Sequence, residues 1–176
     1  NLTWEARQGI LMHSKPRGDF LDRELVKGLT LEGQVCRVSD AVAYLNHDLG
    51  DAFRAGLIAE DRVPREVTEV LGARHSRRIN TMVVDIIENS WAATGPSANG
   101  SHLPTITMSD RCRHALNTLR EFMFEQVYIP RDESAHGRTA RRVVRLLYGH
   151  FDGNRSEIPH EYSARSKSED AAVADF

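Results

Sequence analysis

The feature that most constrains the fold is one long segment whose side chains separate into two faces at helical spacing. Its apolar residues recur in steps of three and four, at Val35, Val38, Val42, Leu45 and Leu49. That period is typical of an α-helix with one face in a protein core. Thr30 can cap the start of this helix and Gly56 can follow its end. The sequence therefore predicts a helix from Leu31 to about Ala55, with Cys36 on it as a small buried hydrophobe.

A second face of the same segment carries polar side chains, namely Asp40, Tyr44, His47, Asp48 and Asp51. Four of these five can bind a metal or hydrogen-bond a sugar, and Tyr44 stands between two acids. Exposed acidic helix faces are nevertheless common, so a plain solvated surface is the simpler interpretation of the spacing. The spacing alone leaves both interpretations open.

Blocks spread along the chain resemble the bacterial deoxyguanosinetriphosphate triphosphohydrolase-like proteins, which belong to the HD-domain metal phosphohydrolases. The central block runs through Leu31–Val35, Ser39–Tyr44, Asn46–Asp48 and Asp51–Gly56, and the others are Asn1–Glu5 with Gly9–Ser14, His75–Ser76 with Arg78–Val83, and Arg120–Glu125 with Val127–Tyr128. The blocks follow the order of the family. This resemblance implies an all-α fold, an HD-domain-type helical bundle present as a partial domain with C-terminal helices.

The resemblance also assigns roles to three residues of the polar face. Asp40 matches the last metal-binding Asp of the HD motif, while Tyr44 and Asp48 match the positions that face the deoxyribose, Asp48 at its 3′-hydroxyl. One and two helical turns correspond to about 6 and 12 Å along a helix axis, roughly the reach from a phosphate to a sugar. The helix would then hold a divalent metal and the sugar at a fixed separation, with the metal at one end of the polar face and the sugar at the other.

The upstream part of the HD motif is missing from this sequence. Family members carry a His, a His-Asp pair and the catalytic acid/base before the block that matches Asn1–Trp4, whereas the one consecutive His-Asp here is His47–Asp48. We therefore expect the chain to be a fragment without catalytic residues of its own. One Asp cannot hold Mg²⁺ or Mn²⁺ alone, and it does not choose between these and other transition metals.

The resemblance suggests that residues 1–60 are the C-terminal part of the HD catalytic domain and that residues 61–176 form a helical region packed on it. The expected function is hydrolysis of a deoxynucleoside triphosphate to the deoxynucleoside and inorganic triphosphate by the whole protein, as a homo-oligomer. The alternative is a non-catalytic paralogue, a nucleotide-binding or interaction subunit that keeps the sugar-facing helix.

Composition adds few constraints. The 176 residues carry 23 Lys and Arg against 25 Asp and Glu, so no strong basic field attracts nucleic acid or a membrane surface. The apolar runs are too short for a membrane span, and two cysteines give no disulfide framework. We expect a cytoplasmic protein that is not membrane-bound. Binding of single-stranded nucleic acid is a weaker alternative, through the arginine stripe Arg138, Arg141, Arg142 and Arg145, which otherwise suits a surface or oligomer contact.

Shorter signals predict the remaining helices. Thr3 and Ser109 can cap helices, and Pro64 with Gly72 can bound a short one. Apolar stripes predict two more helical faces, at Ile79, Met82, Val83, Ile86 and Ile87 and at Cys112, Leu116, Leu119, Phe122 and Met123. Residues 94–101 read as a loop and residues 103–108 as an extended segment.

Two other groups have both a functional and a plain interpretation. Arg74, His75, Arg77 and Arg78 form a basic cluster at the start of a predicted helix, which could meet a nucleotide or an acidic partner but could equally be a solvated cluster. His13 lies in a family-like block, yet it matches none of the metal or acid/base positions. A structural role is therefore the simpler interpretation of His13.

Overall fold

The computed structural model describes residues 2–14, 21, 26–93 and 105–176. It divides into two compact units, residues 1–127 and residues 128–176, and each is considered by itself here. The described residues contain helices and turns and no strand, which confirms the predicted all-α class. None of the described helices is both long enough and apolar enough to cross a membrane.

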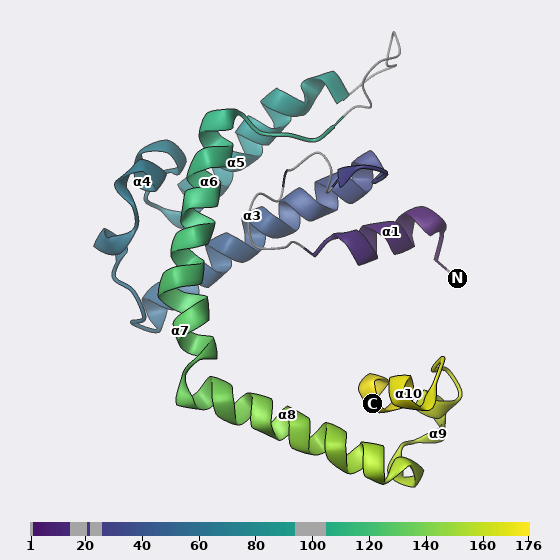
Figure 1. The fold of residues 1–176 in the computed structure, drawn as a ribbon. Coiled ribbons are helices and arrows are strands. Elements are labelled where there is room, and N and C mark those ends of the chain that lie inside the picture. The colour runs from purple at the N-terminus through teal and green to yellow at the C-terminus, as the bar shows by residue number, and fades with distance from the viewer. Residues whose placement is uncertain (1, 15–20, 22–25, 94–104) are drawn as a thin grey trace. The chain divides into compact units, whose positions relative to one another are not determined.

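The first unit is built around its longest helix, α3 (Leu31–Arg54). This helix contacts α1 (Trp4–Met12) and α5 (His75–Ser90), as Figure 1 shows. The short helix α4 (Arg65–Leu71) contacts both α5 and α6 (Asp110–Met123). Two 3₁₀ turns, η1 (Glu60–Arg62) and η2 (Trp91–Ala93), complete the described elements of this unit. The other described helices of this unit therefore pack on α3, either directly or through other helices.

Local signals place α3 where the sequence predicts it. The Thr30 hydroxyl accepts a hydrogen bond from the Gly33 amide at 3.2 Å, which caps the helix. At the other end the chain leaves the helix through Gly56, whose φ of 64° lies in the left-handed region that glycine adopts without strain. The Ala55 amide still bonds to the Asp51 carbonyl at 2.8 Å, so the helix ends within one residue of the prediction.

Four of the five predicted apolar positions on α3 form the centre of the core. Val38, Val42, Leu45 and Leu49 are all at most 4% exposed. Val35 is 47% exposed and Cys36 is exposed, so the prediction that they are buried is wrong. The physical reason is that periodicity fixes the direction of a helix face but not the width that neighbouring helices cover.

Capping signals also predict the other helices of this unit well. The hydroxyls of Thr3 and Ser109 accept hydrogen bonds from the amides of Ala6 and Cys112, at 3.3 and 3.2 Å, and so cap α1 and α6. Pro64 and Gly72 flank α4 as expected. In α6, Cys112, Leu116, Leu119 and Met123 are at most 2% exposed, while Phe122 is half-buried. The capping residues therefore predict the positions of these helices as well as the apolar stripes do.

The α5 stripe is less buried than its spacing suggests. Met82 is fully buried, whereas Val83 and Ile87 are 41% and 50% exposed. The expected extended segment is described from residue 105 onward and is not a strand. Side chains hold it instead, because the Ile106 amide donates to the Gln34 side chain at 2.9 Å and the Thr107 amide donates to the Ser90 hydroxyl at 2.9 Å. The loop expected at residues 94–101 lies outside the described residues.

The second unit follows a π-helical turn, η3 (Phe124–Tyr128), that extends beyond α6. It contains α7 (Ile129–Asp132), α8 (Ala135–Gly153), the 3₁₀ turn η4 (Arg155–Glu157), α9 (His160–Ser163) and α10 (Glu169–Asp175). Its buried apolar side chains are Ile158, Ala172 and Val173, and α8 buries none of its residues. The predicted domain boundary at residue 60 stays a prediction, since compact units need not coincide with catalytic domains.

Arg155 is the polar centre of the second unit. Its guanidinium pairs with Asp152 at 2.6 Å, with Asp170 at 2.7 Å and with Glu169 at 2.5 Å. Hydrogen bonds to Asp152 and Asp170 raise the pKa of Arg155 above its ordinary value. Beside this cluster, the Phe176 ring lies edge-on to Phe151 at a centroid distance of 4.8 Å. These contacts connect the end of α8 to α10.

Candidate functional site

Asp40, Tyr44 and Asp48 lie on the face of α3 that points away from its buried stripe. Asp40 is exposed, Tyr44 is 59% exposed and Asp48 is half-buried. Four-residue steps separate them along the helix, so each lies about 6 Å further along the axis than the one before. The buried positions Val38, Val42 and Leu45 alternate with them in sequence and fix the rotation of this face. The structure thus brings together the three residues singled out from the sequence.

The tyrosine of this trio is electrostatically coupled to both acids. The negative charge of Asp48 raises the pKa of Tyr44, with smaller contributions from burial, from a hydrogen bond between the two side chains and from the charge of Asp40. A phenol next to two carboxylates resists ionisation, because a third negative charge is unfavourable there. Tyr44 therefore stays a hydrogen-bond donor at neutral pH, and it donates to Asp48 in this state.

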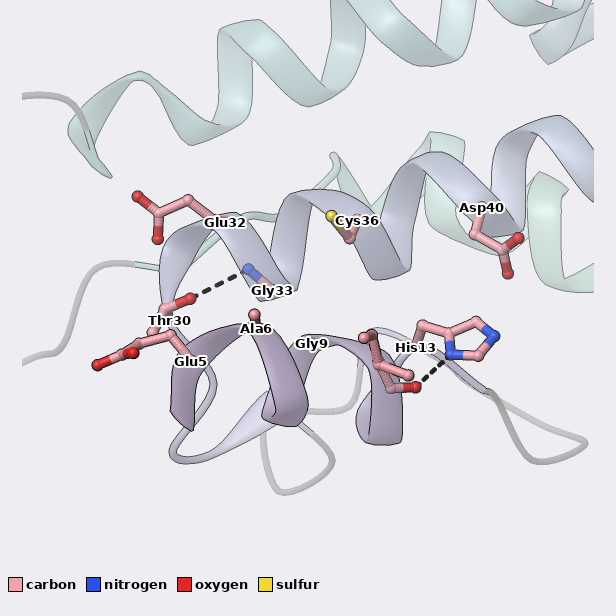
Figure 2. A pocket seen from close by; sticks show the side chains of 10 residues that line it. Glu5, Ala6, Gly9, His13, Thr30, Glu32, Gly33, Cys36 and Asp40 are labelled. Carbon is pink, nitrogen blue, oxygen red and sulfur yellow. Dashed lines mark hydrogen bonds between the residues drawn. The ribbon is translucent and has the colours of Figure 1, made fainter. Parts of the chain in front are cut away.

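A cavity of about 640 Å³ lies between α1 and α3 and begins at Asp40. Its lining includes Ala6, Gly9 and Ile10 from α1 and Gly33, Cys36 and Asp40 from α3. Figure 2 shows Ala6 and Gly9 opposite Gly33. His13, the residue that ends α1, reaches the same cavity. In Figure 2 the Asp40 carboxylate points toward the His13 ring. The cavity therefore continues the polar face of α3 toward its amino-terminal end.

Two glycines bring α1 and α3 close together at this cavity. A Cβ atom built on Gly33 would lie 3.8 Å from the Cα atom of Gly9, and one built on Gly9 would lie 3.9 Å from the Cα atom of Gly33. The backbones thus meet with no side chain between them. The close approach positions His13, at the end of α1, over the part of α3 that carries Asp40.

Arg37 is the residue of this region that sequence reasoning missed. Its side chain is 2% exposed, and its guanidinium donates to the carbonyls of Met12 and Ser14, each at 2.5 Å. Burial lowers the pKa of Arg37 below its ordinary value. Arginine is rarely buried without partners. A sequence signal for this role was available, because Arg37 directly precedes Val38 on the core side of the helix. A charged side chain at such a position needs hydrogen-bond acceptors from elsewhere in the chain.

A second buried polar contact lies at the other end of the polar face. Arg78 is 3% exposed and donates through Nε to the Asn46 side chain at 3.0 Å, as well as to the Ala73 carbonyl. Asn46 in turn donates to the Val42 carbonyl at 2.8 Å. The solvated interpretation of the basic cluster is therefore wrong for Arg78, whose guanidinium is hydrogen-bonded inside the fold, while the ligand interpretation of the cluster stays a prediction. Arg74 and Arg77 are exposed, and His75 packs edge-on against His47 at 5.6 Å.

The residues that the structure describes do not form a complete metal site. They contain no group of three or more His, Cys, Asp or Glu side chains able to hold one ion. Asp40 offers a single carboxylate, whereas Mg²⁺ and Mn²⁺ need several ligands. A metal at Asp40 would need further ligands from outside this set.

The chain is similar to a known domain family and to several known proteins. Residues 106–176 match the model of a phosphohydrolase-associated domain. A deoxyguanosinetriphosphate triphosphohydrolase-like protein from Caldanaerobacter subterraneus subsp. tengcongensis is 37% identical over 178 positions, covering 100% of this chain and 47% of that protein. The family resemblance seen in the sequence is confirmed.

Other relatives agree with this assignment. Proteins of the same name from Clostridium tetani and Desulfatibacillum aliphaticivorans are 37% and 36% identical, over 92% and 88% of this chain and 44% and 42% of their own lengths. The chain thus spans about half the length of the curated relatives it matches. Both the relatives and the domain match relate it to phosphohydrolases. The roles of Asp40, Tyr44 and Asp48 remain hypotheses.

Proposed function

We propose that this chain is part of a metal-dependent phosphohydrolase that converts a deoxynucleoside triphosphate to the deoxynucleoside and inorganic triphosphate. The observation that carries this proposal is the shared polar face of Asp40, Tyr44 and Asp48 on α3, in which Tyr44 bonds to Asp48. The names of the relatives supply the reaction class. The whole protein would be a homo-oligomer, as expected from the family resemblance.

In this proposal the polar face of α3 binds the substrate along its length, from the phosphates to the sugar. Asp48 would accept a hydrogen bond from the 3′-hydroxyl of the deoxyribose, and Tyr44 would pack beside the sugar while holding the Asp48 carboxylate in place. Asp40, two turns away, would be one ligand of a divalent cation, Mg²⁺, Mn²⁺ or another transition metal, near the phosphates. The spacing of about 12 Å between Asp40 and Asp48 suits that separation.

The first test compares the natural full-length protein with its Asp40→Ala variant. With a deoxynucleoside triphosphate and Mn²⁺ or Mg²⁺, we expect wild type to release inorganic triphosphate and the variant to lose turnover and bound metal while keeping its fold. The 176-residue chain alone should be inactive. Unchanged metal content and persistent activity in the variant would show that Asp40 is only a surface acid. Nucleotide binding without hydrolysis by the wild type would favour the non-catalytic subunit.

A second test separates sugar recognition from metal binding. Asp48→Asn should lower kcat/KM about tenfold to a hundredfold with metal content unchanged, because a hydrogen bond to a charged group contributes about 1.5–3 kcal/mol. Tyr44→Phe should act in the same direction but less strongly. With a 2′,3′-dideoxynucleoside triphosphate, Asp48→Asn should add little further loss, since the hydroxyl is already gone.

The matched control for that test is Asp51→Asn. Asp51 lies on the same helix but pairs with Arg54 through an exposed contact, so its loss should leave kcat/KM unchanged for both substrates. Equal losses in Asp48→Asn for the deoxy and dideoxy substrates would show that Asp48 does not contact the 3′-hydroxyl.

A further inference from the structure

The geometry of the cavity beside Asp40 points to a further substrate-binding residue. We propose that His13 binds the phosphate chain of a nucleotide held at Asp40, through the Nε2 atom of its imidazole. This inference rests on the proposed function and deepens it, because it names which part of the substrate the α1 side of the cavity would contact. It also gives His13 a role beyond the structural one that its sequence position suggests.

The His13 ring is oriented by its own backbone turn. Its Nδ1 atom lies 2.6 Å from the carbonyl oxygen of Ile10. A carbonyl oxygen can only accept a hydrogen bond, so Nδ1 carries a proton and donates it. The Nε2 atom is then the ring position available to a ligand. Figure 2 shows this bond and the ring at the same end of the cavity as the Asp40 carboxylate.

The position of His13 is fixed from both sides by a buried arginine. Arg37 bonds to the carbonyls of Met12 and Ser14, the residues that directly flank His13. Because Arg37 is itself on α3, one turn before Asp40, this contact sets the end of α1 against the helix that carries Asp40. Such support from buried polar groups is typical of binding residues that must be held in place.

The ring itself contributes little to the core. His13 is exposed, and its hydrogen bond to the Ile10 carbonyl lies within its own helical turn. A side chain that the structure orients but does not bury is available for a ligand. Replacing His13 should therefore leave the fold intact, which makes its role testable.

The chemistry of the cavity favours phosphate at the His13 end. Its polar lining includes Glu5, Glu32 and Asp40, and His13 is the one lining side chain among the described residues that can carry a positive charge. As an imidazolium it donates from both ring nitrogens, one to the Ile10 carbonyl and one to a phosphate oxygen. Further along, Ala6, Gly9 and Gly33 line the cavity, and Figure 2 shows the carboxylates of Glu5 and Glu32 at the end opposite His13. We therefore place the phosphates at the end of the cavity that carries His13 and Asp40, away from the two glutamates.

The experiment uses the full-length protein and inorganic triphosphate as the probe. In His13→Ala, we expect the inhibition constant of inorganic triphosphate and the KM for the deoxynucleoside triphosphate to rise about tenfold or more, as for loss of a charge-assisted hydrogen bond. The kcat value should change less, and inhibition by the deoxynucleoside product should stay the same because it has no phosphate. His13→Gln, which keeps a donor group, should restore part of the affinity.

His114→Ala is the matched control. His114 is an exposed histidine of α6 that lies outside the cavity lining, so its loss should leave both constants unchanged. Circular dichroism and thermal unfolding of each variant check that the fold is retained. An unchanged inhibition constant in His13→Ala, or a loss confined to kcat, overturns the proposal.

Failure of this inference can be told apart from failure of the proposed function. If wild type hydrolyses deoxynucleoside triphosphates and His13→Ala binds inorganic triphosphate normally, the function stands and the role of His13 is refuted. If wild type hydrolyses nothing, the proposed activity fails, and calorimetric titration of wild type and His13→Ala with inorganic triphosphate decides the phosphate role. Weaker binding by the variant then supports it, and equal or undetectable binding by both proteins overturns it.

Discussion

The two compact units of this chain are stabilised by different interactions. In residues 1–127, long apolar side chains such as Leu49, Leu71 and Leu116 are fully buried, and buried polar groups bond to partners far away in the sequence. In residues 128–176, three small or medium apolar side chains are buried, and exposed ion pairs of Arg155 connect the elements. The comparison shows that the candidate site lies in the unit with the larger interior.

That difference affects how firmly the exposed face of a helix is held in each unit. A polar face on α3 has a fixed direction because the opposite face of the helix is packed. On α8, by contrast, Val143, Val144 and Leu147 are 48%, 66% and 54% exposed, and no residue of the helix is buried. The arginine stripe on α8 therefore lacks the packed scaffold that supports Asp40, Tyr44 and Asp48, and its proposed roles in nucleic-acid or oligomer contacts stay predictions.

The largest expected effect comes from the interior of the first unit. Leu49→Ala should lower the free energy of unfolding of residues 1–127 by about 2–5 kcal/mol, because it removes buried contacts and leaves a cavity. Hydrogen exchange followed by mass spectrometry measures this peptide by peptide. Val143→Ala, on the exposed face of α8, is the control and should have little effect. Equal loss of protection in residues 128–176 after Leu49→Ala would show that the two units do not unfold separately.

A smaller effect is expected from the buried polar contact between α3 and α5. Asn46→Ala removes the acceptor of Arg78 and should cost about 1–3 kcal/mol, the usual penalty for leaving a buried group without its hydrogen bond. The measurement is urea unfolding of Asn46→Ala, Arg78→Met and the double variant. We expect the double variant to cost less than the sum of the two, since the residues share one contact. Strict additivity would contradict the described bond.

The smallest effect is expected from Arg155 in the second unit. Arg155→Ala should increase hydrogen exchange in residues 150–176 at low salt, and the difference from wild type should shrink at high salt, because exposed ion pairs are screened. Arg145→Ala, an exposed arginine of α8, controls for loss of one positive charge. A difference that does not depend on salt would mean that Arg155 acts through packing, and the contrast between the units would then be weaker than described.

Much of the fold could be predicted from local signals. The ends of α3, α4 and α6 follow from Thr30, Gly72 and Ser109, whose side-chain or backbone preferences act within a few residues. The family blocks likewise pointed to the face that carries Asp40, Tyr44 and Asp48. These features depend on short-range chemistry or on matched motifs, which a sequence displays directly.

The errors arise where partners come from distant parts of the chain. Gln34 and Arg37 bond to Ile106 and to the end of α1, over sequence separations of 72 and up to 25 residues, and periodicity gives no information about such partners. The exposure of Val35 depends on how far α5 extends over α3, which is also a tertiary property. The π-helical turn at residues 124–128 likewise does not follow from the apolar stripe or the capping residues of α6.

The meeting of Gly9 and Gly33 has a consequence for how this region can change in evolution. An added methyl group at Gly9 would make ordinary contact with Gly33, at 3.9 Å, and one at Gly33 would also press on the Leu29 side chain at 3.3 Å. Each site can therefore gain a methyl group more easily while the other remains glycine. We therefore expect the two positions to be coupled, so that a methyl group accepted at one of them makes the same change at the other less favourable. We expect this coupling to restrict sequence change on α1 and so to help preserve the separation of His13 from Asp40, which line the same cavity.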